Sequence, residues 1–326
     1  GLYAQAFLDA VDALTAAERP ALRHFAPLLR ASVAAYPDIL TGRVPAAEVV
    51  FPNGSPELVR AVYGQSEISR FYNLVVAGAV RSLAEGLGRD RPIRILEIGA
   101  GTGSTTVEVL HALNTAGIAC DYVFTDLWDK LLADAQQRLG PQHPELRFSF
   151  LDIGTDPALQ GMKEPFDVVV ATNVLHATRN LHLTLRHVKR LLKPGGALVL
   201  NESVEVQAFS TLTFGLLPGW WSAADRSERL PQSPLADTVG WTRLLADEGY
   251  VHTTPLLSPV ADAPSLLAQQ VLVAYSNGEV RLPAAAPRKA TAPVTGAHSL
   301  PSALDGRLRP YALAPLDTAG EAPPSP

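Results

Sequence analysis

"LEIGAGTGSTT", residues 96–106, is the stretch that decides the fold. It begins within an apolar run and is followed by the helical pattern of "STTVEVLHALNTA", so it connects a buried strand to a helix. Gly99, Gly101 and Gly103 allow the backbone to turn tightly and to approach a ligand closely. The N–H groups that begin the following helix favour an anionic group such as a carboxylate or phosphate. Plain strand–helix connectors use such turns too, so the motif needs support from the rest of the chain.

Strand-like and helical segments alternate on the C-terminal side of this loop. After the first strand, which begins at residue 93, the pattern predicts strands within 121–126, 147–153, 166–175, 196–203 and 266–276. Helices are expected within 104–116, 130–139, 183–192 and 239–250. Near-continuous apolar strands separated by helices indicate an α/β fold whose parallel sheet is covered on both faces.

The first part of the chain is predicted to be helical. Residues 1–36 place apolar side chains at helical spacing on one face, namely Leu22, Phe25, Leu28, Leu29 and Val33. Pro37 and "FPNGSP" (51–56) interrupt the pattern, which resumes over 56–87 and ends at Gly86 and Gly88.

Beyond about residue 277 the chain is rich in Ala, Pro, Gly and Ser, a composition typical of a linker. We therefore divide the chain into a helical segment (1–90), an α/β core (91–277) and a linker tail (278–326). The chain begins with glycine rather than methionine, and we expect it to be a piece of a longer protein.

Composition excludes several classes of function. The net charge of −5 argues against nucleic acid or an anionic membrane as partner. The single cysteine, Cys120, excludes an internal disulfide framework and a cysteine-rich zinc site. The sequence contains neither an apolar run of the ~20 residues that a membrane span needs nor a signal-peptide pattern at its start. We expect a soluble cytoplasmic location.

Acidic residues close the second and third predicted strands. Asp126 lies 23 residues after Gly103, at the edge of the sheet where open α/β folds bind ligands, and its carboxylate could accept both hydroxyls of a ribose. Asp152 could accept the amino group of an adenine. The alternative for Asp126 is a helix N-cap, and for Asp152 a turn cap. Together with the glycine loop, these strand ends indicate an adenosine site, while the absence of G-x-x-x-x-G-K-[ST] argues against a nucleoside triphosphate.

At these motifs the chain resembles class I S-adenosylmethionine-dependent methyltransferases. More narrowly, it resembles the C-methyltransferase domain of modular polyketide synthases in "YVFTDLW", "FLDIGTDPALQG", "FDVVVATNVLHATRNLHLTLRHVKRLLKPGGALVLNE" and "TFGLLPGWW". Generic methyltransferases share the glycine motif and "LLKPGG", whereas "NVLHAT" and "FGLLPGWW" are particular to that family. The likeness extends over about residues 93–250. One departure is "SAADRSERLPQSP" (222–234), where the family often has a glycine-containing turn.

The resemblance implies a Rossmann-like fold with a mostly parallel seven-stranded sheet, helices on both faces and an N-terminal helical lid. It implies S-adenosylmethionine as cofactor, bound by Glu97, Gly99, Gly101, Gly103, Asp126, Leu127, Asp152, Ile153 and Asn173. The implied partners are an acyl carrier protein, with a β-ketoacyl chain on its phosphopantetheine, and the neighbouring polyketide synthase domains.

The resemblance also assigns His176 and Glu202 to a catalytic dyad. His176 follows the fourth strand and Glu202 the fifth, and because these strands are neighbours in a doubly wound sheet both side chains can face one crevice. A carboxylate on one imidazole nitrogen fixes the tautomer and strengthens the other nitrogen as a base. Such a base can remove the acidic proton between the two carbonyls of a β-ketoacyl thioester. The alternative is a capped histidine and a solvated carboxylate.

Further residues are expected around the acyl chain. Asn173 and Asn201 either hydrogen-bond the substrate carbonyl or enolate oxygen, or tie down the loop backbone. Phe214, Trp220 and Trp221 either wall the acyl chamber or pack as core. The family's lid lies over the cofactor, so the helical-segment residues Tyr63, Phe71 and Tyr72 are candidates for contact with bound ligands, with Tyr63 and Tyr72 placed on the substrate side. His182 and His187 are expected on a helix surface, and no metal site is predicted.

Three alternative functions remain open. An oxygen methyltransferase of a polyketide synthase would use the same dyad on a β-hydroxyl. An inactive structural remnant would be expected to have a damaged glycine motif or dyad, and both are intact here. A nicotinamide-dependent oxidoreductase would have G-x-G-x-x-G spacing and leaves "NVLHAT" and Glu202 unexplained.

Overall fold

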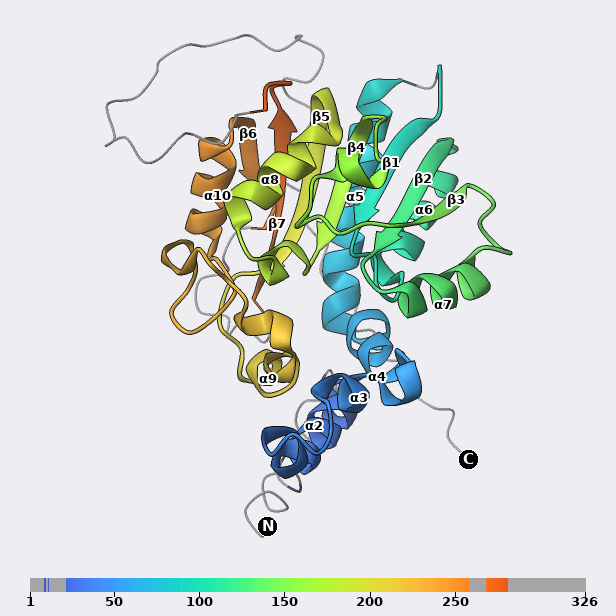
Figure 1. The fold of residues 1–326 in the computed structure, drawn as a ribbon. Helices are drawn as coiled ribbons and strands as arrows, with labels where there is room; N and C mark the ends of the chain where they lie inside the picture. The colour runs from blue at the N-terminus through green and yellow to red at the C-terminus, as the bar shows by residue number, and fades with distance from the viewer. Residues whose placement is uncertain (1–8, 10, 12–21, 89, 258–267, 281–326) are drawn as a thin grey trace, which may run out of the picture.

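The computed structural model describes residues 9, 11, 22–88, 90–257 and 268–280. Its centre is a seven-stranded sheet in the order β3-β2-β1-β4-β5-β7-β6 (Figure 1). The strands are β1 (Ile93–Ile98), β2 (Cys120–Asp126), β3 (Leu146–Phe150), β4 (Phe166–Thr172), β5 (Leu192–Ser203), β6 (Tyr250–Pro255) and β7 (Gln269–Ser276). The first five are parallel, whereas β7 is antiparallel to both β5 and β6. The sheet is therefore mixed, as the expectation of a mostly parallel sheet allows.

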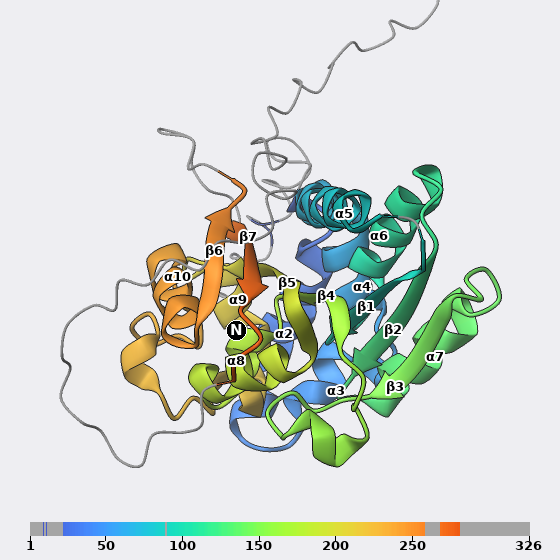
Figure 2. The same ribbon diagram turned by 90° about the horizontal axis from the view of Figure 1, so that it is seen from above.

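Helices cover both faces of the sheet, as expected. One face carries α5 (Glu67–Leu87), α6 (Ser104–Thr115) and α7 (Asp129–Leu139), and the other carries α8 (Leu181–Arg190) and α10 (Thr238–Asp247). Figure 2 shows α5 and α6 on one side of the strands and α8 and α10 on the other. Because parallel strands buried on both faces need apolar residues at every position, β4 is buried from Phe166 to Ala171.

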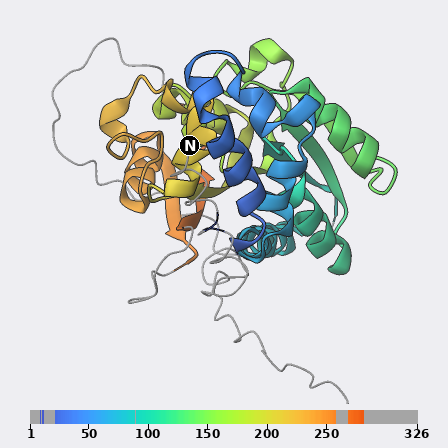
Figure 3. The ribbon, with the colours of Figure 1, turned by 90° about the horizontal axis from the view of Figure 1, so that it is seen from below.

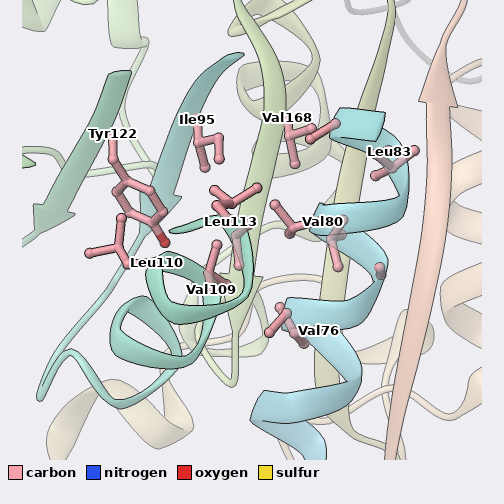
Figure 4. Packing of buried hydrophobic residues seen from close by; sticks show 14 of the residues in the cluster. Val76, Val80, Leu83, Ile95, Val109, Leu110, Leu113, Tyr122 and Val168 are labelled. Carbon is pink, nitrogen blue, oxygen red and sulfur yellow. The ribbon is translucent and has the colours of Figure 1, made fainter. Parts of the chain in front are cut away.

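The packing of α5 and α6 on the sheet is shown in Figure 4. Val76, Val80 and Leu83 of α5 meet Val109 and Leu113 of α6 over the central strands. All are nearly inaccessible to solvent, so each contributes roughly 1.5–3 kcal/mol of burial relative to an exposed side chain. This core fixes the position of the loop between β1 and α6.

A second group of helical segments lies under the carboxyl ends of the parallel strands (Figures 1 and 3). It consists of α2 (Ala26–Leu40), α3 (Ala46–Val50), η3 (Pro52–Gly54), α4 (Glu57–Arg60), η4 (Ala61–Gln65), α9 (Ala208–Leu212), η7 (Phe214–Leu216) and η8 (Pro218–Trp221). Phe25, Leu28 and Val62 form a small apolar cluster of their own, onto which Phe209 and Phe214 pack. Short turns complete the fold: η5 (Pro157–Gln160), η6 (Leu175–Ala177) and η9 (Arg226–Glu228).

Two predicted helix boundaries are wrong. Helix α2 continues through Pro37 to Leu40, because a proline removes only one backbone donor and the residues after it still bond to carbonyls one turn back. The expected helix over 56–87 is broken at Ser66, whose extended backbone and side chain cap the start of α5. Gly86 lies inside α5, and Gly88, with φ +85°, ends it.

Strand β6 is the one element of the sheet that the sequence pattern did not indicate. It lies at the sheet edge, only Tyr250 is buried, and its pairing with β7 shifts register around His252, which has φ +51°. Of the predicted helical stretch 1–36, residues 1–21 apart from 9 and 11 lie outside the described residues, and so does the predicted linker 278–326 from residue 281 on. Within the described part of the chain, no helix has the length and apolar character required to cross a membrane.

Candidate active site

The loop between β1 and α6 contains three left-handed glycines. Gly99, Gly101 and Gly103 have φ values of +60°, +56° and +73°, a region that other residues adopt at a steric cost. A Cβ on Gly101 would meet nothing closer than the Gly99 carbonyl oxygen at 3.8 Å, whereas a Cβ on Gly99 would lie 2.4 Å from Val174. Gly99 is thus required by packing, and Gly101 lies on the open side of the loop.

Asp126 at the end of β2 anchors this loop. Its Oδ2 accepts a hydrogen bond from the N–H of Gly101 at 2.9 Å, and its Oδ1 accepts one from the N–H of Trp128 at 2.9 Å. Burial raises the pKa of the carboxyl, although these backbone N–H groups act in the opposite direction. Each oxygen keeps a second lone pair for a ligand hydroxyl. Leu127 beside it is half exposed.

The carboxylate of Asp152 accepts hydrogen bonds from the turn that directly follows it. Its Oδ1 accepts from the N–H of Gly154 at 2.8 Å and its Oδ2 from the hydroxyl of Thr155 at 3.0 Å. This is the turn-capping arrangement considered above as the alternative, although the side chain remains at the third strand end. Ile153 is buried in the core, and its carbonyl bonds to the ring of His187 at 2.8 Å.

Two histidines on α8 are not alike. His187 is 4% exposed, so the expectation that it lies on a helix surface is wrong; it faces the Ile153 carbonyl across the core. His182 is partly exposed and bonds to Glu248 at 2.8 Å. In the described parts of the chain, no three His, Cys, Asp or Glu side chains gather closely enough to hold a metal ion.

Glu97, expected near the cofactor, lies under the glycine loop. It is buried, and its Oε2 accepts hydrogen bonds from the hydroxyls of Thr106 and Tyr122 at 2.5 and 2.7 Å. Burial raises its pKa to about 7, partly offset by these two bonds. These two bonds connect β1 to the following helix α6 and to the neighbouring strand β2.

The structure brings His176 and Glu202 into contact. Nδ1 of His176 lies 2.5 Å from Oε2 of Glu202, and both side chains are buried. The other oxygen of Glu202 accepts the N–H groups of Val174 at 3.1 Å and Leu175 at 2.8 Å. Glu202 thus holds both the ring of His176 and the backbone before it. Nε2 of His176 has no hydrogen-bond partner among the described residues.

Asn173 and Asn201 differ in their surroundings. Asn173, with φ +49°, uses both ends of its amide: Oδ1 accepts from the N–H and hydroxyl of Ser203, and Nδ2 donates to Gln269 at 3.0 Å. Asn201 is 1% exposed, and among the described residues neither its Nδ2 nor its Oδ1 has a partner. Leaving such groups unpaired in a core costs about 1–3 kcal/mol each, so the Asn201 amide is suited to a ligand.

The aromatic side chains expected around the acyl chain differ in their contacts with the dyad. The ring of Trp220 contacts that of His176 edge to face, with centroids 5.8 Å apart, and its buried Nε1 has no hydrogen-bond partner in the described part of the chain. Tyr63 stacks on Phe214 at 5.9 Å, and both burial and the Glu202 charge raise the pKa of its hydroxyl. Trp221 is half exposed and donates to the Gly215 carbonyl.

Tyr72 and Phe71 lie on α5. The hydroxyl of Tyr72 accepts the N–H of Gln269 at 3.3 Å, and Phe71 packs edge to face against Tyr72. Tyr72 therefore bridges α5 to the start of β7, next to the Gln269 side chain that bonds Asn173.

Three residues beside the dyad were not predicted from the sequence. The hydroxyl of Thr172, in register with Asn201 on the neighbouring strand, is buried and has no hydrogen-bond partner within the described ranges. Arg229 and Asp225 form a buried ion pair of 2.7 Å that contacts the loop of His176. Thr172 ends an apolar strand, a position that could have marked it, whereas nothing in "DRSER" distinguishes Arg229 from a surface arginine.

Together, the sheet order, the glycine loop after its first strand and the acidic residue ending the second strand define a class I methyltransferase. A family model described as a methyltransferase domain matches residues 96–198. The chain is an S-adenosylmethionine-dependent methyltransferase.

Comparison with related sequences and solved structures shows to which group of methyltransferases the chain belongs. The chain is 42% identical over 245 residues to polyketide synthase ThaG of Burkholderia thailandensis, a match that covers 74% of this chain and 4% of that protein. It shares 37% identity and a TM-score of 0.77 with the crystal structure of the DszA carbon methyltransferase, covering 85% of this chain and 70% of that one. The trans-methyltransferase CalH, solved in complex with SAH, shares 28% identity and a TM-score of 0.65 over 83% and 72% of the two chains. The chain therefore belongs to the methyltransferase domains of polyketide synthases.

Proposed function

We propose that the chain transfers a methyl group from S-adenosylmethionine to the α-carbon of a β-ketoacyl thioester. The observation that carries this proposal is the pair His176–Glu202, in which Nδ1 of the imidazole contacts the carboxylate and Nε2 has no hydrogen-bond partner among the residues that the structure describes. Structural relatives titled carbon methyltransferases support carbon as the acceptor.

The dyad supplies the proton transfer. Glu202 can only accept hydrogen bonds when ionised, and it already accepts two backbone N–H groups, so it favours the tautomer with the proton on Nδ1. Nε2 then carries the lone pair and takes the proton from the α-carbon. The electrons of that C–H bond pass into the enolate, so the α-carbon becomes the nucleophile for the methyl group that S-adenosylmethionine would supply, with the electrons of the broken S–CH3 bond remaining on the cofactor sulfur. Glu202 stabilises the imidazolium that forms, and general-base catalysis of this kind contributes ~10²–10⁴-fold.

The strand ends fit the cofactor. The open side of Gly101 gives room for close approach, the N-terminus of α6 favours the cofactor's carboxylate, and Asp126 has lone pairs for ribose hydroxyls. Leu127, Asp152 and Ile153 would surround the adenine, and Asn173 and Glu97 would support the loop from behind. When bound, the sulfonium supplies an electrophilic methyl group. The SAH in the CalH structure, the demethylated form of the cofactor, supports this assignment.

The substrate chamber is assigned to the residues next to the dyad. The unpaired amide of Asn201 would donate to the substrate carbonyl or the enolate oxygen, where a hydrogen bond stabilises developing charge. Trp220, Phe214, Tyr63 and Tyr72 would wall the chamber, with Trp221 at its solvent side. The cluster formed by α2–α4 and the α9–η8 segment would act as the lid.

The substrate is proposed to arrive on an acyl carrier protein. The curated relatives are polyketide synthases of which the chain spans 4–12% in the bacterial cases, so its partners are inferred to be neighbouring domains of such an assembly.

The experiment is a comparison of two carrier-bound substrates. A β-ketoacyl and a β-hydroxyacyl carrier protein of equal chain length are each incubated with enzyme and S-adenosylmethionine, and intact mass is recorded. We expect a gain of one methyl group on the β-keto substrate alone. Methylation of the β-hydroxy substrate alone would establish the oxygen methyltransferase instead, and no methylation of either would favour an inactive domain.

A further inference from the structure

Arg229 lies at the centre of a buried hydrogen-bond network beside the dyad. Its side chain is 1% exposed, and its Nε donates to Oδ1 of Asp225 at 2.7 Å. Its Nη1 donates to the carbonyl oxygens of His176 at 2.5 Å and Pro234 at 2.7 Å. Its Nη2 donates to the carbonyl of Thr178 at 2.7 Å. All these acceptors except Asp225 are backbone groups of two loops.

Asp225 extends the network to α8. Its second oxygen accepts the N–H of Leu181, the first residue of that helix, at 2.6 Å, and the neighbouring Ala224 N–H bonds to the Arg179 carbonyl at 2.8 Å. The segment after the two tryptophans is thereby fastened along the whole loop from His176 to the start of α8.

The loop that carries His176 is held from both ends. Glu202 accepts the N–H groups of Val174 and Leu175 before it, and Arg229 donates to the carbonyl of His176 itself. Fixing the backbone on both sides of His176 fixes the direction of its Cα–Cβ bond, from which the imidazole reaches Glu202. The ring of Trp220, in η8 directly before this segment, contacts the ring of His176 edge to face and completes the enclosure.

We infer that Arg229, held by Asp225, is a positioning residue that keeps the His176 imidazole on Glu202 with Nε2 turned toward the substrate. The inference rests on the proposed function of the dyad. An arginine is required because its planar fork directs donors at three carbonyls and one carboxylate at once, which the single ammonium of a lysine cannot do. The pairing with Asp225 neutralises the buried charge. The segment 222–234, where the sequence departs from the family pattern, thus helps to position His176, the proposed base.

The test uses R229K, with R186K as the matched control. Arg186, like Arg229, pairs with a buried carboxylate, but it does so on α8 through two bonds to Glu248, from Nε at 2.6 Å and from Nη2 at 2.9 Å. Proton NMR monitors the low-field resonance of the hydrogen between His176 and Glu202, assigned by its loss in Glu202→Gln. We expect R229K to lose or shift this resonance and to reduce kcat at least tenfold, with KM and cofactor affinity within twofold.

The control separates positioning from stability. R186K should lower the melting temperature by a similar amount while leaving the resonance and kcat unchanged. If R229K does the same as R186K, Arg229 is structural only and the inference is wrong. If R229K does not fold, D225N decides: we expect the same shift of the resonance with a smaller loss of kcat, and an unchanged resonance would overturn the inference. If His176→Ala methylates at the wild-type rate, the proposed catalytic role of the dyad is wrong. The resonance measurement on R229K is independent of that result, because it reports the hydrogen bond between His176 and Glu202 rather than methylation.

Discussion

At the scale of single residues, two buried carboxylates near the carboxyl ends of β1 and β5 have different surroundings. Glu202 accepts two backbone N–H groups and contacts the imidazole. Glu97 accepts hydrogen bonds from the hydroxyls of Thr106 and Tyr122, and no cationic side chain of the described residues pairs with it. Burial of Glu97 therefore favours the protonated form, and stability should depend on pH through this residue.

Glu97→Gln is expected to flatten the pH dependence of stability between pH 4.5 and 7. The pKa of Glu97 is raised from 4.5 to about 7 by burial, so below pH 4.5 the residue is protonated in both states and its contribution is fully present. As pH rises to 7 the unfolded chain releases its proton first, and the free energy of unfolding falls by about 3 kcal/mol. Urea unfolding at a series of pH values measures this slope.

Glu85→Gln provides the control for this measurement, because Glu85 is half exposed on α5 and should leave the slope unchanged. An identical slope in wild type and Glu97→Gln would mean that Glu97 is ionised in the folded protein.

At the scale of elements, the glycine loop between β1 and α6 packs against the loop that carries His176. Gly99 packs on Val174, whose N–H is held by Glu202, while Gly101 is tied to Asp126 at the end of β2. Two strand ends and a helix start are therefore fixed relative to one another. A change on the open side of this loop should affect the ligand more than the fold.

Gly101→Asp is expected to abolish or greatly weaken S-adenosylmethionine binding, because the added side chain would occupy the space for the ligand and place a carboxylate there. Gly195→Asp is the matched control: Gly195 also has a positive φ, +75°, with no atom within 4 Å of its added Cβ, but lies at the amino end of β5. Both variants should lose similar stability from the strained backbone. Calorimetry that finds wild-type affinity in Gly101→Asp would place the cofactor elsewhere.

Most elements could be predicted from the sequence because buried parallel strands leave unbroken apolar runs. "FDVVVAT" is such a run, whereas "YVHTTP" at the sheet edge is mostly exposed and carries no comparable signal. The break at Ser66 depends on a side-chain cap within an otherwise helical pattern, and the continuation of α2 through Pro37 depends on packing around that helix. Local pattern cannot resolve either.

At the scale of the whole molecule, the site depends on sheet order. β4 and β5 are neighbours, so His176 and Glu202, 26 residues apart in the chain, come into contact. That neighbourhood follows from the doubly wound pattern and could be predicted. The different roles of Asn173 and Asn201 could not, because they depend on the backbone twist at φ +49° and on the pairing of β5 with β7. Arg229 could not be predicted either, since its acceptors are backbone carbonyls.

Ending the chain after residue 280 is expected to leave the fold and the cofactor site intact. The last strand of the sheet ends at Ser276, and the composition of the tail predicts a linker that cannot supply a packed core. The melting temperature should change by less than ~2 °C, which corresponds to less than about 1 kcal/mol for a chain of this size, and S-adenosylmethionine affinity should be unchanged. A fall of many degrees in calorimetry would show that the tail packs on the domain.

The most direct measurement is deuterium uptake at the α-carbon of a β-ketoacyl carrier protein in heavy water, without cofactor, compared between wild type and His176→Ala. With the imidazole as base, the wild-type enzyme should accelerate exchange above the spontaneous rate, and His176→Ala should return it to that rate. Calorimetry should show that both bind S-adenosylmethionine equally, because in the proposed mechanism the ring takes the substrate proton and does not hold the adenosine. Equal acceleration of exchange by His176→Ala and wild type would contradict the assignment of His176 as the base.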